Sequence, residues 1–441
     1  MYEDCNSMKD ARDVFAATPL RDVYVCSAMI AAEARVGDPR EAIRLFHNMQ
    51  QHHQVRPNSV TCVSAINACA RIGDSEEGRR IHEGIIQSGL VQMTPFLASS
   101  LIAFYGACGP LAEVQRLFEE FAQFHADGVV WNAAMAACVN LGHPRAALEY
   151  FDWMRAKKIR PTPSTFINAL SACTDPKDLS TGQLIHSLIR SDKTQIRMNA
   201  NLASSLVTMY GRCGSVEEAI GVFNDTKPLH NVVVENAMIA VLTRANRSEE
   251  PLAIFRQIQN RGGGGTKKVL DPLTLRLGLR ACSTLDQVRE IQNLISSDQS
   301  PEVFATLISV YAHLHNLADA RAVFDRVSSL GSASIWNAMM MACADLQPKS
   351  GPEISRLYKE MISRGIKPDK DTFGILLSSC TDLDEGRVLQ EQIVQSGIKL
   401  DALISAALIS MFRRCGGSLE EAKRVFEDTR RTCETSTCTV R

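Results

Sequence analysis

The sequence predicts an all-α protein in which tandem helix pairs stack into an α-solenoid. The first observation behind this prediction is a recurrence. The stretch MYGRCGSVEEAIGVF at 209–223 has copies at 1–15, 104–118, 310–324 and 411–426, and these copies start 101 to 105 residues apart. Repeat units usually have about 20 to 50 residues, so an interval of this length is expected to hold several of them.

The second observation is that two weaker sets of copies lie within each interval. One set begins at Cys26, Trp131, Glu235 and Trp336, and the other begins at Cys62, Phe166, Leu275 and Phe373. The chain is therefore a three-part cycle of repeats with about 35 residues each, a length that suits helix-pair repeats.

The third observation is the spacing of apolar residues within one repeat. They recur every three or four positions on both sides of Gly214, which is the pattern of two amphipathic helices. Gly214 is predicted to adopt the left-handed conformation that ends the first helix, and Ser215 with Glu218 is predicted to form a capping box at the start of the second. One such hairpin cannot bury its apolar stripe alone, so we expect stacked repeats with the first helices on the inner surface.

The composition excludes some classes of function. The 441 residues are 45% hydrophobic and 22% charged, as in ordinary folded proteins. No apolar run approaches the roughly 18 to 20 residues that span a bilayer, so no membrane partner is predicted. The net charge is −1, which argues against a protein that holds nucleic acid mainly by neutralising phosphates. Binding through base edges and stacking remains compatible with this charge.

The cysteines are predicted to be packing residues. Ten of the 14 fall near the end of a first helix, in one recurring slot: Cys5, Cys69, Cys108, Cys138, Cys173, Cys213, Cys282, Cys343, Cys380 and Cys415. A small thiol in a repeated slot is expected to be buried as an apolar group. We therefore predict no metal site and no cofactor.

Together these motifs resemble pentatricopeptide repeats, and specifically the plant arrays that cycle through P, L and S repeats. YGRCGSVEEAIGVF resembles an S repeat, WNAAMAAC with a closing KKIRPT resembles a P repeat, and INACARIGDSEEGRRIHEGIIQSGL resembles an L repeat. The pattern of tetratricopeptide repeats is absent. The resemblance covers nearly the whole chain and implies a right-handed superhelix of about twelve helix-turn-helix repeats plus one partial repeat.

The expected boundaries follow the cycle. A partial S repeat occupies 1–22, the array occupies 23–434, and a tail occupies 435–441. The P repeats are 23–58, 128–162, 232–271 and 333–369. The L repeats are 59–94, 163–199, 272–300 and 370–401. The S repeats are 95–127, 200–231, 301–332 and 402–434. Met1 and Tyr2 align with Met209 and Tyr210, so we expect the chain to be part of a longer array.

The resemblance implies sequence-specific binding of single-stranded RNA, with one base read by the fifth and last residues of a repeat. Ser27 with Asn58 and Ser204 with Asn231 imply adenine, Ser99 with Asp127 implies guanine, Asn132 with Thr162 implies a pyrimidine, and Asn236 with Asp271 and Asn337 with Asp369 imply uracil. The second residue of a repeat resembles the family's base-sandwiching position. It is Tyr24, Phe96, Val129 and Val233 in four of the repeats.

The pattern departs from the family toward the C-terminus. Ala305 and Ala406 replace the expected polar readers, and Glu302, Ser334 and Asp371 are poor stacking groups. We therefore expect weak or nonspecific reading after about Asp271, with Asn337 and Asp369 as an exception.

Two simpler explanations compete with these assignments. An Asn at the fifth position could hydrogen-bond a neighbouring turn instead of a base. Trp131 and Trp336, one place before the fifth residue, are predicted to pack between repeats and not to stack on RNA.

Catalysis by this chain is not predicted. Cytidine deaminases, which accompany many arrays of this type, need an HxE motif and a PCxxC motif to hold zinc and move protons, and both are absent. Three hypotheses remain: a specificity factor for C-to-U editing of organellar transcripts with a deaminase or editing-complex protein in trans, an RNA-processing, splicing or translation factor, and a protein-binding scaffold. No small-molecule substrate is predicted, and the resemblance implies a mitochondrion or chloroplast as the location.

Overall fold

The computed structural model describes residues 8–18, 22–51, 55–89, 93–122, 128–191, 196–247, 249–261, 270–296, 299–346, 350–398, 402–418, 420–425 and 427. All regular structure in these residues is helical. The start of the predicted partial repeat at 1–7 and the predicted tail at 435–441 lie outside the described residues.

Helices alternate between two roles along the chain. The first helices of the repeats are α2 (Val23–Arg35), α4 (Ser59–Ile72), α6 (Pro95–Cys108), α8 (Gly128–Asn140), α10 (Pro163–Ala172), α12 (Ala200–Arg212), α14 (Val232–Arg244), α16 (Pro272–Ala281), α18 (Pro301–His313), α20 (Ala333–Leu346), α22 (Lys370–Ser379) and α24 (Ala402–Cys415). Each begins at the first residue of a predicted repeat.

The second helices follow them, and α1, the second helix of the predicted partial repeat, precedes α2. They are α1 (Met8–Ala17), α3 (Pro39–Gln51), α5 (Ser75–Ser88), α7 (Leu111–Ala122), α9 (Pro144–Ala156), α11 (Leu179–Arg190), α13 (Val216–Asp225), α15 (Glu249–Asn260), α17 (Leu285–Gln292), α19 (Leu317–Val327), α21 (Gly351–Ser363) and α23 (Leu383–Gln395). Short 3-10 turns occur at Pro176–Asp178, Lys227–Leu229 and Ser328–Leu330.

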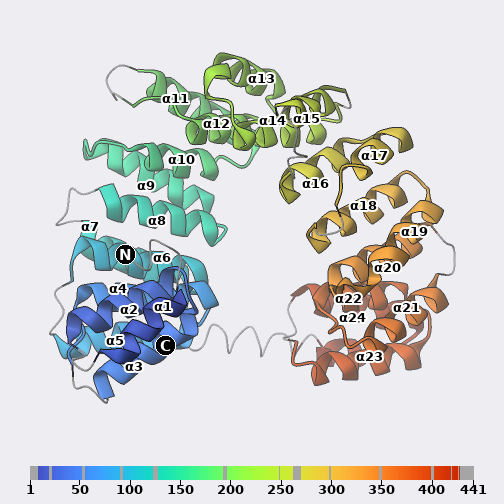
Figure 1. The fold of residues 1–441 in the computed structure, drawn as a ribbon, viewed down its shortest axis with the longest axis horizontal. Helices are drawn as coiled ribbons and strands as arrows, with labels where there is room; N and C mark the ends of the chain where they lie inside the picture. The colour runs from blue at the N-terminus through green and yellow to red at the C-terminus, as the bar shows by residue number, and fades with distance from the viewer. Residues whose placement is uncertain are drawn as a thin grey trace. The chain divides into compact units, whose positions relative to one another are not determined.

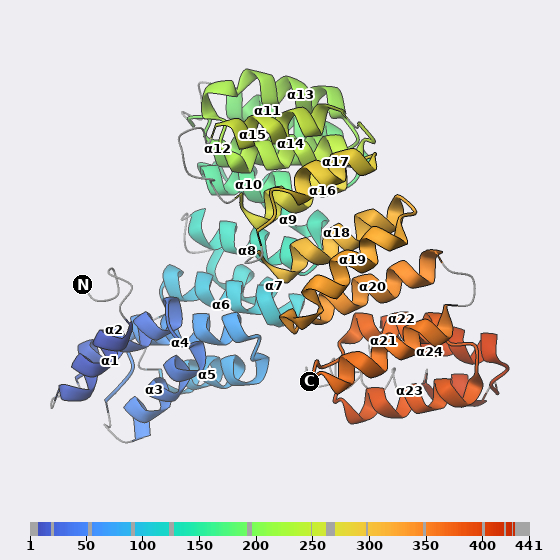
Figure 2. The ribbon, with the colours of Figure 1, turned by 45° about the vertical axis from the view of Figure 1, so that its right-hand side comes forward.

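The chain divides into two compact units, Met1–Val241 and Leu242–Arg441, called here the N-terminal and the C-terminal unit. In the N-terminal unit the first helices pack in succession, α2 on α4, α4 on α6, α6 on α8, α8 on α10 and α10 on α12 (Figures 1 and 2). In the C-terminal unit α16, α18, α20, α22 and α24 do the same. Second helices pack on their own first helix and on the next one, as α3 does on α2 and α4. The predicted all-α solenoid is confirmed.

Of the two predictions made for helix ends, the one for Gly214 is confirmed and the one for Ser215 is wrong. Gly214 has a φ of 80°, the left-handed conformation predicted for the end of a first helix. The capping box predicted for Ser215 is wrong, because the side chain of Ser215 makes no capping hydrogen bond to the backbone of α13. Its hydroxyl donates instead to the carboxylate of Glu218. A hydrogen bond to a charged carboxylate is a strong one, so it fixes the hydroxyl although it satisfies no backbone N–H of the helix.

The core between repeats is built from a recurring aromatic pair. Trp131 packs edge-on against Phe118 at a centroid distance of 4.8 Å, and Trp336 packs in the same way against Phe324 at 4.8 Å. Both indoles are almost completely buried. The prediction that Trp131 and Trp336 are packing residues is confirmed, because neither ring is accessible to a base.

The recurring cysteines are packing residues as well. Among the nine of the predicted set that the structure describes, Cys69, Cys138, Cys173, Cys213, Cys343 and Cys380 are buried, while Cys108, Cys282 and Cys415 are partly buried; Cys5 lies outside the described residues. Burial raises the pKa of the Cys69 thiol to about 12, since the thiolate would be charged in an apolar environment. Such thiols stay protonated and unreactive at neutral pH.

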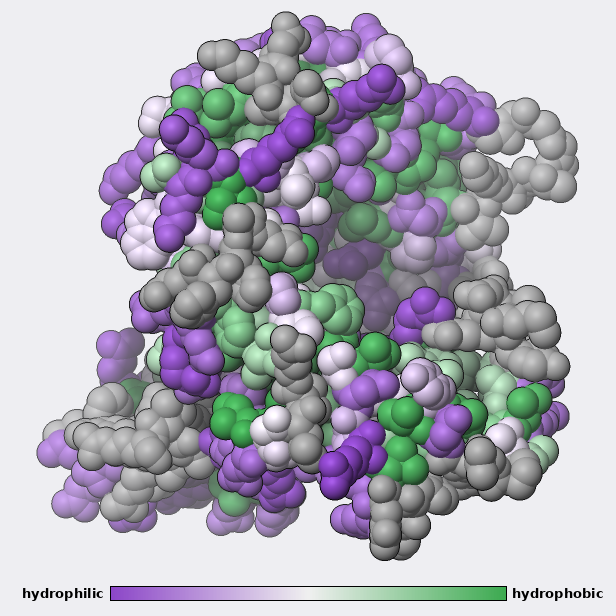
Figure 3. All heavy atoms as spheres, turned by 90° about the vertical axis from the view of Figure 1, so that its left-hand side faces the viewer, coloured by the Kyte–Doolittle hydropathy of each residue, from purple (hydrophilic) through white to green (hydrophobic). Residues whose placement is uncertain are grey.

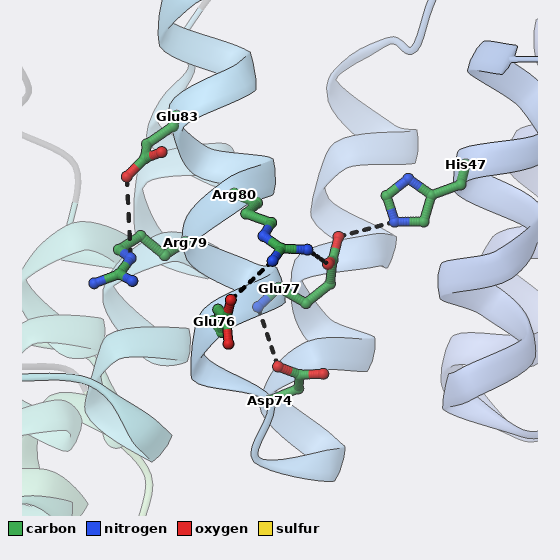
Figure 4. A network of polar contacts seen from close by, with 7 residues as sticks. All are labelled: His47, Asp74, Glu76, Glu77, Arg79, Arg80 and Glu83. Carbon is green, nitrogen blue, oxygen red and sulfur yellow. Dashed lines mark hydrogen bonds and ion pairs between the residues drawn. The ribbon is translucent and has the colours of Figure 1, made fainter. Parts of the chain in front are cut away.

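The outer layer of second helices carries ion pairs between neighbouring repeats. Figure 4 shows a polar contact between two of these helices, in which Nε2 of His47 on α3 lies 2.8 Å from Oε1 of Glu77 on α5. Glu77 also contacts Arg80 of its own helix, with 3.5 Å between Nη1 and Oε2. The face of the molecule in Figure 3 mixes hydrophilic and hydrophobic side chains. Among the described residues, no helix is long and apolar enough to cross a membrane, and no cluster of three metal-binding side chains is found.

Candidate nucleic-acid interface

Apolar side chains at the second position of many first helices are exposed to solvent. The predicted sandwiching residues Tyr24, Phe96, Val129 and Val233 have exposed fractions of 77%, 59%, 45% and 52%. Val60, Leu273 and Leu403 occupy the same slot and are also exposed, although they were not predicted as site residues. Single exposed apolar residues are common on protein surfaces, but their recurrence at one position of seven first helices makes this row the candidate contact surface.

Asn132 is joined to the predicted partner Thr162 by a direct hydrogen bond. Its Nδ2 donates to Oγ1 of Thr162 over 3.1 Å, and its Oδ1 accepts from Oγ1 of Thr165 over 2.7 Å. Thr162 precedes α10 and forms a reciprocal capping box with Thr165. The fifth and last residues of this predicted P repeat therefore meet at the first turn of the next repeat.

Asn337 and Asp369 repeat this arrangement in the C-terminal unit. Nδ2 of Asn337 donates to Oδ1 of Asp369 over 2.9 Å, and Oγ1 of Thr372 donates to Oδ1 of Asn337 over 2.8 Å. Asp369 caps α22 by accepting from the backbone N–H of Thr372 over 2.8 Å. Burial acts to raise the pKa of Asp369, but the hydrogen bonds from Thr372 and Asn337 outweigh it and hold the pKa below its usual value.

Ser27 and Asn58 are linked through a third residue and not directly. The hydroxyls of Ser27 and Thr61 lie 2.6 Å apart, and Oγ1 of Thr61 donates to Oδ1 of Asn58 over 2.8 Å. The single hydroxyl proton of Ser27 is shared between Thr61 and the carbonyl of Val23, each 2.6 Å away. Asn58 caps α4, and its side chain is partly exposed. The pair thus presents the Asn58 amide at the surface while Ser27 lies beneath it.

Asn236 belongs to the N-terminal unit and Asp271 to the C-terminal unit. Asn236 is buried in α14. Asp271 caps α16, where it accepts from the backbone N–H of Thr274 over 2.9 Å and from its hydroxyl over 2.6 Å.

The predicted readers of the S repeats are arranged differently. Ser99 donates to the carbonyl of Phe96 over 2.9 Å, and Ser204 donates to that of Asn201 over 3.1 Å, so each hydroxyl is bonded within its own helix. Asn231 accepts from the backbone N–H groups of Val233 and Val234 over 3.1 Å each, at the start of α14. Asp127 lies outside the described residues.

A groove in the C-terminal unit shows that the second and fifth positions share one surface. Its volume is about 1100 Å³. The second, fifth and ninth residues of successive first helices line it: Glu302, Ala305 and Ser309 of α18, Ser334, Asn337 and Met341 of α20, and Asp371, Gly374 and Ser378 of α22. Asn337 is the fifth-position residue of these three helices with a side-chain amide.

The site contains four residues that the sequence analysis did not identify. Thr61, Thr165, Thr274 and Thr372 are completely buried. Each is the third residue of its helix and bonds to the capping residue just before that helix. A threonine recurs three residues after the end of each predicted P repeat, and this recurrence in the sequence could have identified the four residues.

Several segments of the chain match models of known repeat families. The model described as "PPR repeat family" matches residues 21–71, and the one described as "Pentatricopeptide repeat domain" matches 118–175. A third, "PPR repeat", matches 60–90, 203–227 and 236–263. A chloroplastic pentatricopeptide repeat-containing protein of Arabidopsis thaliana is 29% identical over 426 residues, which are 95% of this chain and 66% of the relative. This chain belongs to the pentatricopeptide repeat family.

Other pentatricopeptide repeat relatives share the organellar names. A mitochondrial pentatricopeptide repeat-containing protein of Arabidopsis thaliana is 28% identical over 385 residues, 86% of this chain and 54% of the relative. The present chain thus spans about half to two thirds of these two relatives. The location predicted from the sequence, a mitochondrion or chloroplast, is confirmed by these names.

Among solved structures, the pentatricopeptide repeat protein PPR10 from maize is similar with a TM-score of 0.46 and 19% identity, over 98% of this chain and 62% of that protein.

Proposed function

We propose that this pentatricopeptide repeat protein binds single-stranded RNA of organellar transcripts in a sequence-specific manner. The observation that carries the proposal is the row of exposed apolar residues at the second position of the first helices, in particular Tyr24 and Phe96. In the groove of the C-terminal unit, the second and fifth positions line the same surface. This geometry suits a base whose faces are covered by one set of side chains and whose edge meets another.

The chemistry of the two positions suits RNA. Stacking of a base on an aromatic side chain contributes roughly 1 to 3 kcal/mol and tolerates any base, so it supplies affinity. Amides and hydroxyls at the base edge supply discrimination, because unstacked bases expose their donors and acceptors. The proposed readers remain Ser27 with Asn58, Ser99 with Asp127, Asn132 with Thr162, Ser204 with Asn231, Asn236 with Asp271 and Asn337 with Asp369. The net charge of −1 implies that phosphate contacts contribute little.

The finer proposal is that the chain selects sites for C-to-U editing as a member of the P, L, S subfamily. The order of its repeats supports this assignment, and the boundaries given above are part of the proposal. The chemistry would be supplied by a deaminase or editing-complex protein in trans, and the chain itself is proposed to be non-catalytic. Co-purification of a deaminase with the tagged chain from an organellar extract, retained after RNase treatment, is the expected result.

RNA affinity at physiological salt tests the central proposal. A twelve-nucleotide probe of sequence A-n-G-Y-n-A-U-n-n-U-n-n is compared with a shuffled probe. We expect tighter binding of the first, reduced about tenfold by Tyr24→Ala or Phe96→Ala, as loss of one stacking contact predicts. The matched control is Val394→Ala, which removes an equally exposed apolar group from the second helix α23. Equal binding of both probes would contradict sequence-specific reading.

A further inference from the structure

The third residue of every first helix follows a rule that separates the L repeats from the others. It is Thr61, Thr165, Thr274 and Thr372 in the L repeats, all with no exposed surface. In the other first helices it is Val25, Leu97, Val130, Leu202, Val234, Val303, Ile335 and Ile404. A hydroxyl therefore occupies a slot that is apolar elsewhere in the array. Burying a hydroxyl is unfavourable unless it is hydrogen-bonded, so its partners indicate its purpose.

Capping explains only part of these bonds. Thr165 and Thr372 each complete a reciprocal capping box with the residue before their helix. However, they also reach 33 and 35 residues back along the chain, to Oδ1 of Asn132 and Oδ1 of Asn337. Thr61 reaches 34 residues back to Ser27 in the same way. A helix cap does not need a bond to the preceding repeat.

The bonds fix which way the fifth-position amide faces. The carboxylate of Asp369 has no proton to donate, so the group 2.9 Å from its Oδ1 must be the NH₂ of Asn337. Oδ1 of Asn337 then faces Thr372, whose single hydroxyl proton is shared between this oxygen and Oδ1 of Asp369, each 2.8 Å away. The reversed amide would place two acceptor oxygens against each other at Asp369. Asn132 has the same orientation, with its NH₂ toward Thr162 and its Oδ1 toward Thr165.

A fixed amide matters because uracil and cytosine differ by an exchange of donor and acceptor. Uracil offers an N–H donor beside an acceptor oxygen, whereas cytosine offers an acceptor nitrogen beside an NH₂ donor. A side-chain amide with one orientation discriminates between these edges, and an amide that flips can satisfy both. In the S repeats, Ser99 and Ser204 are tied to their own helices and have no such support.

We propose that a buried threonine, Thr61, Thr165 or Thr372, is a specificity-determining positioning residue for the P repeat before it. It orients the fifth-position side chain and so sets which donor and acceptor face the base. This inference rests on the proposed RNA binding. The strongest cases are Thr372 behind Asn337 and Thr165 behind Asn132.

Thr372→Val tests the inference, because valine keeps the shape and removes the hydroxyl. Folding is expected to survive, since eight other first helices hold Val, Leu or Ile in this slot. Binding is measured for four versions of the probe that differ only at the nucleotide facing Asn337. We expect the wild-type preference between uracil and cytosine to fall about tenfold in Thr372→Val, as loss of one buried hydrogen bond predicts. Thr372→Ser restores the hydroxyl and should restore the preference.

The control is Thr306→Val, which removes another buried hydroxyl of a first helix. Thr306 donates only within α18, to the carbonyl of Glu302 over 2.8 Å, so base preference at Asn337 should be unchanged. An unchanged preference in both Thr372→Val and Thr165→Val would overturn the inference while leaving RNA reading intact. A wild-type chain that shows no base preference at any position would contradict the proposed function as well. Equal losses in Thr306→Val and Thr372→Val would also overturn it, because packing would then explain both.

Discussion

Asn337 of α20 and Asp369 at the start of α22 are joined by a 2.9 Å hydrogen bond across 32 residues of sequence. The same Oδ1 atom of Asp369 accepts the backbone N–H of Thr372 over 2.8 Å. One carboxylate therefore caps a helix and holds the fifth-position residue of the preceding repeat. Because both bonds stabilise the ionised carboxylate more than the neutral acid, the pKa of Asp369 lies below its ordinary value although burial acts in the opposite direction.

The depressed pKa predicts how stability changes with pH. A carboxyl group whose pKa is lower in the folded state contributes stability above its unfolded pKa of about 3.9, and this stability is lost as the pH falls through the folded value. Asp369→Asn should therefore destabilise the protein by about 1 to 3 kcal/mol at pH 7, and the difference should shrink below about pH 4. Urea unfolding between pH 3 and 7 measures it.

The control for this experiment is Asp371→Asn, on the first turn of the same helix but exposed. It removes a charge from the helix N-terminus without breaking the bond to Asn337. A destabilisation equal to that of Asp369→Asn would show that the helix terminus, and not the link between repeats, accounts for the effect.

The helix pairs could be predicted from the sequence because their apolar period and Gly214 act locally. The hydrogen bonds of Asn132 and Asn337 could not, since they depend on which residues two repeats bring together 30 to 35 positions apart. The simpler explanation, that a fifth-position Asn hydrogen-bonds a neighbouring turn, accounts for the bonds that Asn132 and Asn337 make to the first turn of the next repeat. The bonds of the buried threonines to the preceding repeat could not be predicted either, because threonine is common at the start of any helix, where its hydroxyl caps the helix.

Gly106 in α6 allows the backbones of two neighbouring first helices, α6 and α8, to approach closely. A Cβ at this position would lie 2.4 Å from Cβ and 2.6 Å from Cα of Ala137 on α8, so the backbones would have to separate. Gly106→Ala should destabilise the protein by about 1 to 3 kcal/mol. Gly221→Ala in α13 is the matched control, because a Cβ there meets no atom within 4 Å. It should stabilise by about 0.5 to 1 kcal/mol, as alanine is the better helix former. Thermal unfolding of both variants checks this, and similar losses would refute the role of packing.

The burial of His82 leads to a second prediction about how folding stability depends on pH. Its Nδ1 lies 2.8 Å from the hydroxyl of Tyr105, and its Nε2 is buried without a hydrogen-bond partner among the described residues. Burial, with a smaller contribution from Arg116, lowers the pKa of His82. The folded state therefore resists the proton that the unfolded state accepts near pH 6.5, so stability is present above that pH and declines as the pH falls through it.

Another L repeat has glutamine at the position that corresponds to His82. Gln292 accepts a hydrogen bond from Tyr311, as a neutral side chain in the equivalent contact between an L and an S repeat. His82→Gln should thus flatten the decline in urea midpoint between pH 7.5 and 5.5. His143→Gln, at an exposed position, should leave it unchanged. An identical pH profile for His82→Gln and the wild type would assign the decline to other groups.

The second helices of the C-terminal unit are connected by one side chain per repeat. Arg256 pairs with Glu290, Arg289 with Asp319, Arg321 with Glu353 and Arg387 with Glu421, with N–O distances of 2.8 to 3.0 Å. In the remaining repeat Ser355 takes the place of the arginine and donates to Glu385 over 2.6 Å. The row is thus a continuous chain of contacts with one uncharged member.

Ser355→Arg should complete this row with an ion pair to Glu385. Exposed ion pairs contribute only about 0.2 to 1 kcal/mol, so we expect a small rise in the urea midpoint. The rise should disappear in the Glu385→Gln background, because the double variant retains the new charge and removes its partner. It should also shrink between 0.05 and 0.5 M NaCl, since salt screens exposed charges. A gain that persists in Glu385→Gln would come from the helix propensity of arginine, and the pairing between repeats would then play no part in it.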